Sequence, residues 1–197
     1  MDVPEVARIR QATAEDLHTI LDVLADAFEE DPVMQWVTPK ASYPRYAFEL
    51  TVPFCLGHGH TYVAADGSGA ASWLPPGVRL ASPVSPSVVW HGLREYGPTS
   101  LLRGLATLLQ TQNRHPNEDY YYLLTIGALR SARGRGVGSA LMREGLLRCD
   151  AAHMPAYLES SSESNVPFYR KHGFEVVDEL HLAMNGPTLW LMWRPAR

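Results

Sequence analysis

The chain has little cysteine and no excess of positive charge. Its 197 residues include only two cysteines, Cys55 and Cys149, and no CxxC spacing. A disulfide framework or a zinc site is therefore not expected, and a reducing cytoplasm is the expected compartment. The formal net charge is −4, whereas a general nucleic-acid binder needs clustered Lys and Arg to displace counterions. We therefore expect no nucleic-acid partner.

Long apolar runs and metal-ligand clusters are also missing. No stretch approaches the roughly 20 apolar residues that span a bilayer, so no membrane partner is expected. The opening MDVPEVARIR carries acidic residues and no apolar core, so we expect no signal peptide. His58 and His60 are the only close histidine pair and have no third ligand nearby, so no metal is expected. Nothing in the sequence indicates an oligomeric state.

What remains is the composition of an ordinary globular protein, with 46% hydrophobic and 19% charged residues. This length fits one domain, residues 1–197, with a substantial core. Apolar periodicity and turn residues predict an α/β chain. Strands are expected at 6–11, 62–65, 70–74, 120–129, 156–160, 174–182 and 188–193, and helices at 17–28, 43–56, 86–95, 98–112, 137–150 and 164–172. We expect Pro32 to end the first helix and residues 75–118 to be a helical insertion covering one face of the sheet.

The stretch from Leu123 to Leu141, LLTIGALRSARGRGVGSAL, organises the rest of the chain. It reads as an apolar strand, a turn rich in arginine and glycine, and then a helix. This order presents backbone N–H groups and the positive end of a helix dipole to an anion, as a pyrophosphate cradle does. The turn lacks the GK[ST] end of a P-loop and the GxGxxG spacing of a dinucleotide fold. Taken alone, it is equally consistent with a loop whose glycines only allow tight packing.

A second segment, PAYLESSSESNVPFYRKHGFEV from Pro155 to Val176, decides between these alternatives. Together the two segments resemble the GCN5-related N-acetyltransferase (GNAT) superfamily. Its pyrophosphate motif, (Q/R)xxGxG/A, is matched by Arg133, Gly136 and Gly138, and its later signature by Asn165, Phe168-Tyr169 and Gly173-Phe174. Within the superfamily the chain is most similar to puromycin N-acetyltransferases, strongly over residues 120–194 and patchily before. Arg130 departs from the pattern, because the superfamily usually has proline there.

The resemblance implies a GNAT fold, with a mixed central sheet of six to seven strands splayed at the cofactor slot and flanked by helices. It implies acetyl-CoA as cosubstrate and no metal. The backbone of Ile126, Gly127 and Ala128 is expected to pair with the pantetheine amides, with Gly127 marking a bulge. The diphosphate is expected at Arg133, Gly134, Arg135, Gly136, Val137, Gly138 and Ser139. Arg135 either touches a phosphate or is an exposed cation.

Acetyl transfer to an amine needs a neutral amine, a donor for the oxyanion and an acid for the departing thiolate. Tyr169 is the candidate acid, the alternative being a core tyrosine. Glu159, near the end of a strand, is the candidate base, acting through water; alternatively it faces solvent or an arginine. Asn165 is expected to hydrogen-bond the cofactor, to cap its helix, or both. A backbone N–H near Ala128 is the expected oxyanion donor.

These residues predict an N-acetyltransferase that acts on a primary amine of a small molecule by direct attack in a ternary complex. An aminonucleoside antibiotic such as puromycin is one candidate acceptor, in resistance or detoxification. The alternatives are acetylation of a peptide or protein amine, or a non-catalytic acetyl-CoA-binding regulatory domain. The acidic run 29–31 either attracts a cationic amine or is a solvated helix end.

Overall fold

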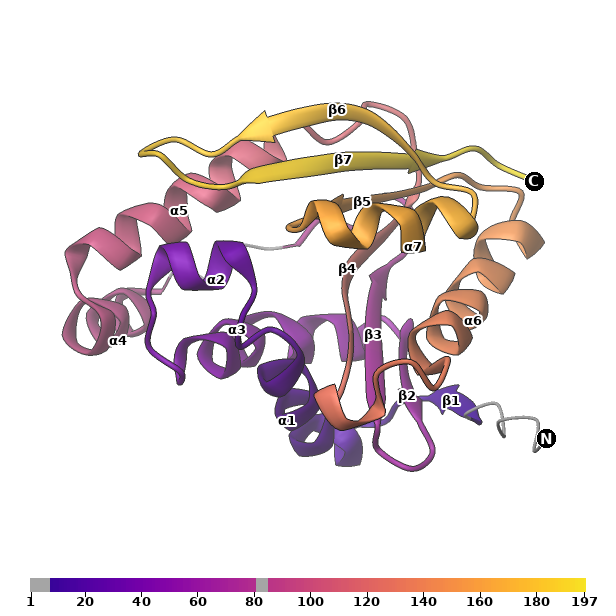
Figure 1. Cartoon of the computed structure of the whole chain (residues 1–197), viewed down its shortest axis with the longest axis horizontal. Helices are drawn as coiled ribbons and strands as arrows, with labels where there is room; N and C mark the ends of the chain where they lie inside the picture. The colour runs from indigo at the N-terminus through magenta and orange to yellow at the C-terminus, as the bar shows by residue number, and fades with distance from the viewer. Residues whose placement is uncertain (1–7, 81–84) are drawn as a thin grey trace.

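A computed structural model describes residues 8–80 and 85–197 of the chain. Its centre is a seven-stranded mixed sheet with the order β1-β2-β3-β4-β5-β7-β6 (Figure 1). The strands are β1 (Ile9–Gln11), β2 (Thr61–Ala64), β3 (Gly69–Leu74), β4 (Tyr121–Ala128), β5 (Ala156–Ser160), β6 (Glu175–His181) and β7 (Thr188–Arg194). The α-helices are α1 (Leu17–Ala27), α2 (Pro32–Val37), α3 (Tyr43–Gly57), α4 (Pro86–Tyr96), α5 (Pro98–Gln112), α6 (Val137–Ala151) and α7 (Val166–Lys171). The expected α/β fold with a splayed mixed sheet is confirmed, although residues 6 and 7 of the first expected strand lie outside the described residues.

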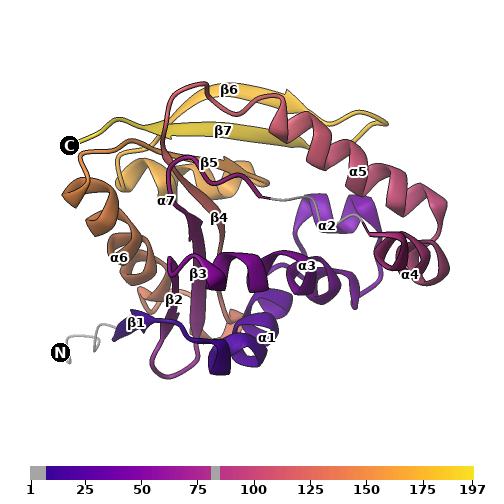
Figure 2. The same ribbon diagram turned by 180° about the vertical axis from the view of Figure 1, so that it is seen from behind.

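The sheet opens in its middle. β4 and β5 run parallel and pair only at Tyr121 with Ala156 and at Tyr122 with Tyr157. The other neighbouring strands are antiparallel. Both views show β2–β4 running at a steep angle to β5–β7 (Figures 1 and 2). Beyond Tyr122 the facing edges of β4 and β5 are therefore unpaired.

Helices cover both faces of the sheet. α6 packs on β2, β3 and β4, while α1 and α3 pack on β3 from the other face. The alternation of side chains decides which residue joins which core: Tyr62 packs in the α6 cluster and Val63 in the α1–α3 cluster. A third cluster, around Tyr157 and Leu191, includes Trp36 of α2. α7 lies on the α6 side, because Tyr169 belongs to the α6 cluster.

Two details of the first half differ from expectation. α1 ends at Ala27, and Pro32 does not stop it; instead Pro32 opens the short helix α2. Proline is well suited to the first turn of a helix, because its missing N–H has no partner there anyway. The β4 bulge lies at Leu124 and not at Gly127, since Ser72 pairs with Thr125 and Trp73 with Leu123.

The segment between β3 and β4 contains the two expected helices, α4 and α5. α5 packs on α2, where Arg103 donates a hydrogen bond to the Trp36 carbonyl at 2.6 Å. Farther along, Arg114 forms an ion pair of 2.5 Å with Asp178 of β6. The segment thus extends the helical layer beside the sheet toward the β6–β7 hairpin. That it is an insertion stays a prediction.

Candidate active site

A slot of about 740 Å³ opens where β4 and β5 separate. It is lined by residues 123–128 of β4, by the turn into α6, by the end of β5, by α7 and by the turn between α1 and α2. These are the segments in which the sequence placed nearly all of its candidate residues. One exception is Arg135, which is exposed and does not line the slot.

The backbone edge of β4 faces this slot. The N–H of Leu129 donates to the Ser68 carbonyl at 2.9 Å, so Leu129 and Gly127 direct their backbone groups at β3. Because these directions alternate along a strand, the N–H and C=O groups of Ile126 and Ala128 point away from β3 toward the slot. The two residues present unpaired strand groups where the sequence expected an extended ligand to pair.

Gly127 is required by close packing and not by a bulge. A Cβ at this position would lie 2.8 Å from the Cβ of Ala27 and 3.1 Å from Leu24. Any side chain here would push α1 off β4. Gly127 therefore lets α1 lie directly on the strand that borders the slot.

The turn before α6 contains two glycines in left-handed conformations. Gly136, the N-cap of α6, has a left-handed φ of 83°, and no side chain caps the helix. Gly134 before it also has a positive φ, of 78°. These conformations favour glycine and leave the N–H groups of Val137 and its neighbours without side-chain partners. With the positive end of the helix dipole, this turn fits a diphosphate.

The other side of the slot carries Tyr169. This residue is 8% exposed. Burial, and secondarily the nearby Asp31 carboxylate, raise the pKa of the Tyr169 hydroxyl, which therefore stays protonated at neutral pH. Asn165 also lines the slot and is the N-cap residue of α7, but its side chain makes no capping hydrogen bond. Of its two expected roles, the capping role is not observed.

Glu159 faces neither solvent nor an arginine. Its side chain is 7% exposed and lines the slot. One carboxylate oxygen, Oε2, accepts a hydrogen bond of 2.7 Å from the Tyr122 hydroxyl. The other, Oε1, lies 3.1 Å from Nε2 of His115. The carboxylate is thus held by side chains from two other segments.

Asp31, in the acidic run that was expected either to attract a cationic amine or to be a solvated helix end, lines the slot. Its Oδ1 accepts hydrogen bonds from the N–H groups of Val33 at 2.9 Å and Met34 at 3.0 Å, and so caps α2. Its Oδ2 accepts a hydrogen bond from the Ser161 hydroxyl across the slot. Burial raises the pKa of Asp31, and these hydrogen bonds offset only part of that effect. An aspartate followed by proline is a helix-start signal that could have identified this cap.

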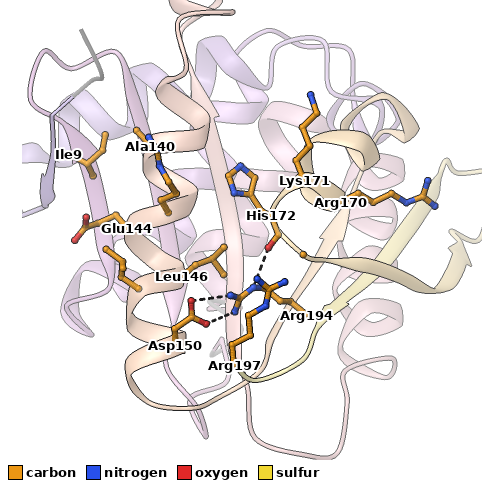
Figure 3. A pocket seen from close by; sticks show the side chains of 13 residues that line it. Ile9, Ala140, Glu144, Leu146, Asp150, Arg170, Lys171, His172, Arg194 and Arg197 are labelled. Atoms are coloured by element: carbon orange, nitrogen blue, oxygen red, sulfur yellow. Dashed lines mark hydrogen bonds and ion pairs between the residues drawn. The ribbon is translucent and has the colours of Figure 1, made fainter. Parts of the chain in front are cut away.

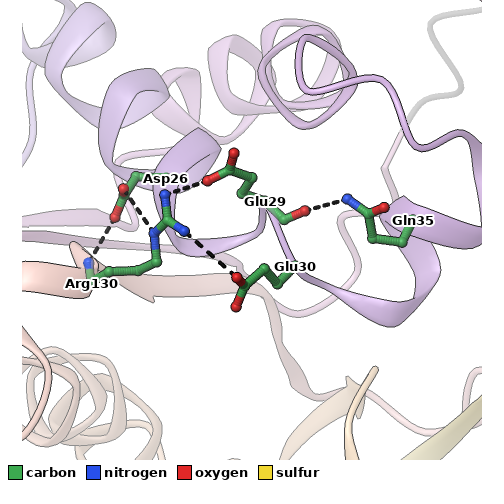
Figure 4. A network of polar contacts seen from close by, with 5 residues as sticks. All are labelled: Asp26, Glu29, Glu30, Gln35 and Arg130. Atoms are coloured by element: carbon green, nitrogen blue, oxygen red, sulfur yellow. Dashed lines mark hydrogen bonds and ion pairs between the residues drawn. The ribbon is translucent and has the colours of Figure 1, made fainter.

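Arg130 binds carboxylates at the end of α1 (Figure 4). Its backbone N–H donates to Asp26 at 2.7 Å and its Nε to the same carboxylate at 3.2 Å. Its guanidinium also forms ion pairs with Glu29 and, at 3.8 Å, with Glu30. The residue that replaces the usual proline therefore ties the turn before α6 to α1, and it does not line the slot.

A second hollow, of about 640 Å³, lies between α6 and α7 (Figure 3). Its lining includes the exposed cations Arg143, Arg170, Lys171 and Arg197. Arg194 also lines it, but this buried guanidinium is paired with Asp150 at 2.8 Å. We call this hollow the cationic cavity. It concentrates positive charge beside α6 in a chain whose net charge is negative.

Two kinds of site are not found in the part of the chain that the structure describes. There, no three His, Cys, Asp or Glu side chains cluster as metal ligands would. Across residues 8–80 and 85–197, none of the helices combines the length and the apolar character that crossing a bilayer requires.

Comparison with known proteins agrees with this geometry. Residues 104–176 match the family model of the acetyltransferase (GNAT) domain. An uncharacterized N-acetyltransferase of Schizosaccharomyces pombe is 23% identical over 188 residues, which are 88% of this chain and 76% of that protein.

Solved structures share the whole fold. One described as histone acetyltransferase HPA2 and related acetyltransferase, from Corynebacterium glutamicum, is 27% identical with a TM-score of 0.74, covering 98% of both chains. Arylalkylamine N-acetyltransferase 2 of Aedes aegypti is 15% identical with a TM-score of 0.68, covering 98% of this chain and 100% of its own. The matched residues and the shared fold are similar to those of GNAT acetyltransferases, and the chain is an acetyl-CoA-dependent N-acetyltransferase.

Proposed function

We propose that this enzyme transfers the acetyl group of acetyl-CoA to a primary amine of a small molecule, by direct attack in a ternary complex. The observation that carries the proposal is the slot between β4 and β5. It has an uncapped helix N-terminus at one end and the buried side chains of Tyr169 and Glu159 at the other. Acetyl-CoA supplies the activated acetyl thioester.

The residues that hold the cosubstrate follow from the two polar surfaces of the slot. Ile126 and Ala128 offer unpaired strand groups to the pantetheine amides. The turn from Arg133 through Ser139 offers N–H groups to the diphosphate, and the cationic cavity adds long-range attraction for an anionic ligand. Asn165 lines the slot without an intrahelical partner, and its amide is free for the cosubstrate.

The reacting groups are assigned by what each can do with a proton. Tyr169 is protonated near neutral pH, so it donates its proton to the leaving sulfur and is reprotonated by a proton from the acceptor nitrogen. Glu159 accepts a proton from the acceptor amine, through water. The Ala128 N–H, pointing into the slot, is the donor for the oxyanion.

A small amine is preferred as acceptor because the acid–base groups are buried. Asp31 and Ser161, which both line the slot, are joined by a hydrogen bond between segments distant in sequence. Of the named neighbours, the Aedes aegypti enzyme is called an arylalkylamine acetyltransferase and the Corynebacterium glutamicum protein a histone acetyltransferase. The similarity of residues 120–194 to puromycin N-acetyltransferases keeps an aminonucleoside in the proposal, with resistance or detoxification as the role. The free, buried Cys55 and Cys149 accord with a reducing cytoplasm.

The test is an amine panel assayed by thiol release from acetyl-CoA. It includes puromycin, arylalkylamines, polyamines and an N-terminal peptide, with an amine-free reaction as control. We expect release that depends on a small amine. Release with the peptide alone would replace the proposal by peptide acetylation, and binding of CoA with no amine acetylated would make the domain a non-catalytic acetyl-CoA binder.

A further inference from the structure

His115 and Glu159 form a buried acid–base pair. His115 lies between α5 and β4, outside the motifs that identify the superfamily. Its side chain is 14% exposed and that of Glu159 is 7% exposed, and Nε2 lies 3.1 Å from Oε1. In the described residues this oxygen has no aligned hydrogen bond, and the His115 imidazole is within reach of it. Charges interact more strongly at such a buried site than at the surface.

Aromatic side chains hold the imidazole in place. Its ring centroid lies 4.8 Å from that of Tyr122 and 5.3 Å from that of Tyr157. Its Nδ1 atom lies 2.7 Å from the Tyr120 hydroxyl. A partner at one ring nitrogen fixes the role of the other, so Nε2 is left for the carboxylate.

The pair joins two cavities. Glu159 lines the slot, whereas His115 and Tyr122 line a separate cavity of about 340 Å³ together with Leu108 and Thr111 of α5. We call it the α5 cavity. A proton on Glu159 thus has a route through His115 that does not return through the slot.

The chemistry requires such a route. An acceptor that binds as R–NH₃⁺ gives an amide, a thiol and one free proton. Of its three N–H protons, one stays on the amide nitrogen, one reaches the sulfur through Tyr169, and one leaves the enzyme. Glu159 must lose this last proton before the next turnover.

We propose that His115, with its Nδ1–H donating to the Tyr120 hydroxyl, takes this proton from Glu159 at Nε2 and passes the Nδ1 proton on through that half-buried hydroxyl, away from the slot. The inference rests on the proposed function, in which Glu159 is the base. His115 does not touch the acceptor, so it is a positioning residue that acts through Glu159. The titratable groups that face it are Glu159 and Tyr157 from β5, Tyr120 and Tyr122 from the β4 side, and Arg79 from the segment after β3.

Imidazole rescue tests the proposal. In His115→Ala we expect kcat for a primary amine to fall about tenfold or more, with the affinity for CoA by calorimetry unchanged. Free imidazole fits the space left by the side chain and should restore kcat in a saturable manner. His181→Ala, which removes an exposed histidine of β6, is the control and should respond to neither change. An unchanged kcat, or a lost kcat that imidazole does not restore while CoA still binds, overturns the proposal.

A second measurement does not depend on how His115→Ala folds. The ¹⁵N chemical shift of the His115 Nε2 atom should change in Glu159→Gln, while that of His181 should not. An unchanged chemical shift of the His115 Nε2 atom shows that the two groups are not coupled, and it overturns the proposed proton transfer from Glu159 to His115. If the wild type acetylates no amine at all, the proposed function fails, and the proton transfer through His115 fails with it. If the wild type is active and His115→Ala is equally active, only the proton transfer through His115 is overturned.

Discussion

At the scale of single residues, the proposed acid is a group that keeps its proton and the proposed base is a group that can take one. Burial and the Asp31 carboxylate raise the pKa of Tyr169, so this phenol remains a donor across the neutral range. Glu159 sits across the opening, on the strand face that meets Tyr122 and Tyr157. The two side chains therefore reach the slot from opposite faces of the sheet. Different surroundings suit one group that donates a proton and another that accepts one.

Replacing Tyr169 with phenylalanine tests the acid. The ring still packs, but no proton is available, so we expect kcat to fall about 100-fold while CoA affinity changes little. Steady-state kinetics combined with calorimetry measure both quantities. Weaker CoA binding at unchanged kcat would show that Tyr169 serves the cosubstrate and not the proton transfer.

Asp31 leads to a prediction for pH and stability. Because burial raises its pKa in the folded state, the stability that it contributes is present below about pH 3.8 and is lost as the pH rises through the folded pKa. Asp31→Asn keeps the helix cap without the buried charge. We expect a melting temperature about 2–4 °C higher at pH 7, the shift that about 1 kcal/mol produces in a chain of this size, and a smaller difference at pH 4. A lower melting temperature at pH 7 would mean that the Asp31 charge is net stabilising.

Single residues also show where sequence reasoning stops. The motif positions Tyr169 and Glu159 were predicted to face the slot, and the structure places both there. The contact of Asp31 with Ser161 and that of His115 with Glu159 were not predicted, because each joins residues distant in sequence. Spacing along the chain carries no signal for such contacts.

At the scale of elements, β4, its following turn and α6 form the framework of the site. The strand supplies an open backbone edge, and the turn supplies a helix N-terminus without a side-chain cap. Arg130 ties this turn to α1 through Asp26 and Glu29. Since the Arg130 side chain is 41% exposed, these ion pairs position the turn more than they stabilise the fold.

Gly136→Ala tests this framework. At a φ of 83° an alanine costs about 1–2 kcal/mol, and relief of that strain moves the N–H groups of the turn. We expect CoA affinity to fall about tenfold, the equivalent of about 1.4 kcal/mol, as measured by calorimetry.

Gly57→Ala is the matched control. Gly57 ends α3, and a Cβ there meets no atom within 4 Å. The same change should leave CoA affinity unaltered and raise stability by up to about 1 kcal/mol. Equal CoA affinity in Gly136→Ala and the wild type would mean that the turn does not hold the diphosphate.

The elements themselves were well predicted from sequence. Periodicity and turn residues located the β2–β3 hairpin, β5 and the helices α4 to α6 nearly to the residue, because each is a local pattern. The predictions were wrong for residues whose role depends on a neighbouring element. Gly127 was assigned to a bulge, but it is glycine because α1 packs on it, and Pro32 begins α2 instead of ending α1.

At the scale of the whole molecule, the residues of the proposed site come from both faces of the sheet. α6 and α7 lie on one face and carry the proposed diphosphate-binding turn and Tyr169, while His115 and the α5 cavity belong to the other. The gap between β4 and β5 connects them. The resemblance to the superfamily predicted the splay, but the arrangement on the acceptor side depends on how α2 and α5 pack, and the motifs do not cover α2.

A crystal structure with CoA tests the central claim most directly. We predict the diphosphate at the N–H groups of residues 137–139, with the pantetheine chain extended along Ile126 and Ala128 between β4 and β5. CoA bound elsewhere, for example wholly within the cationic cavity with the β4 edge unpaired, would contradict the account.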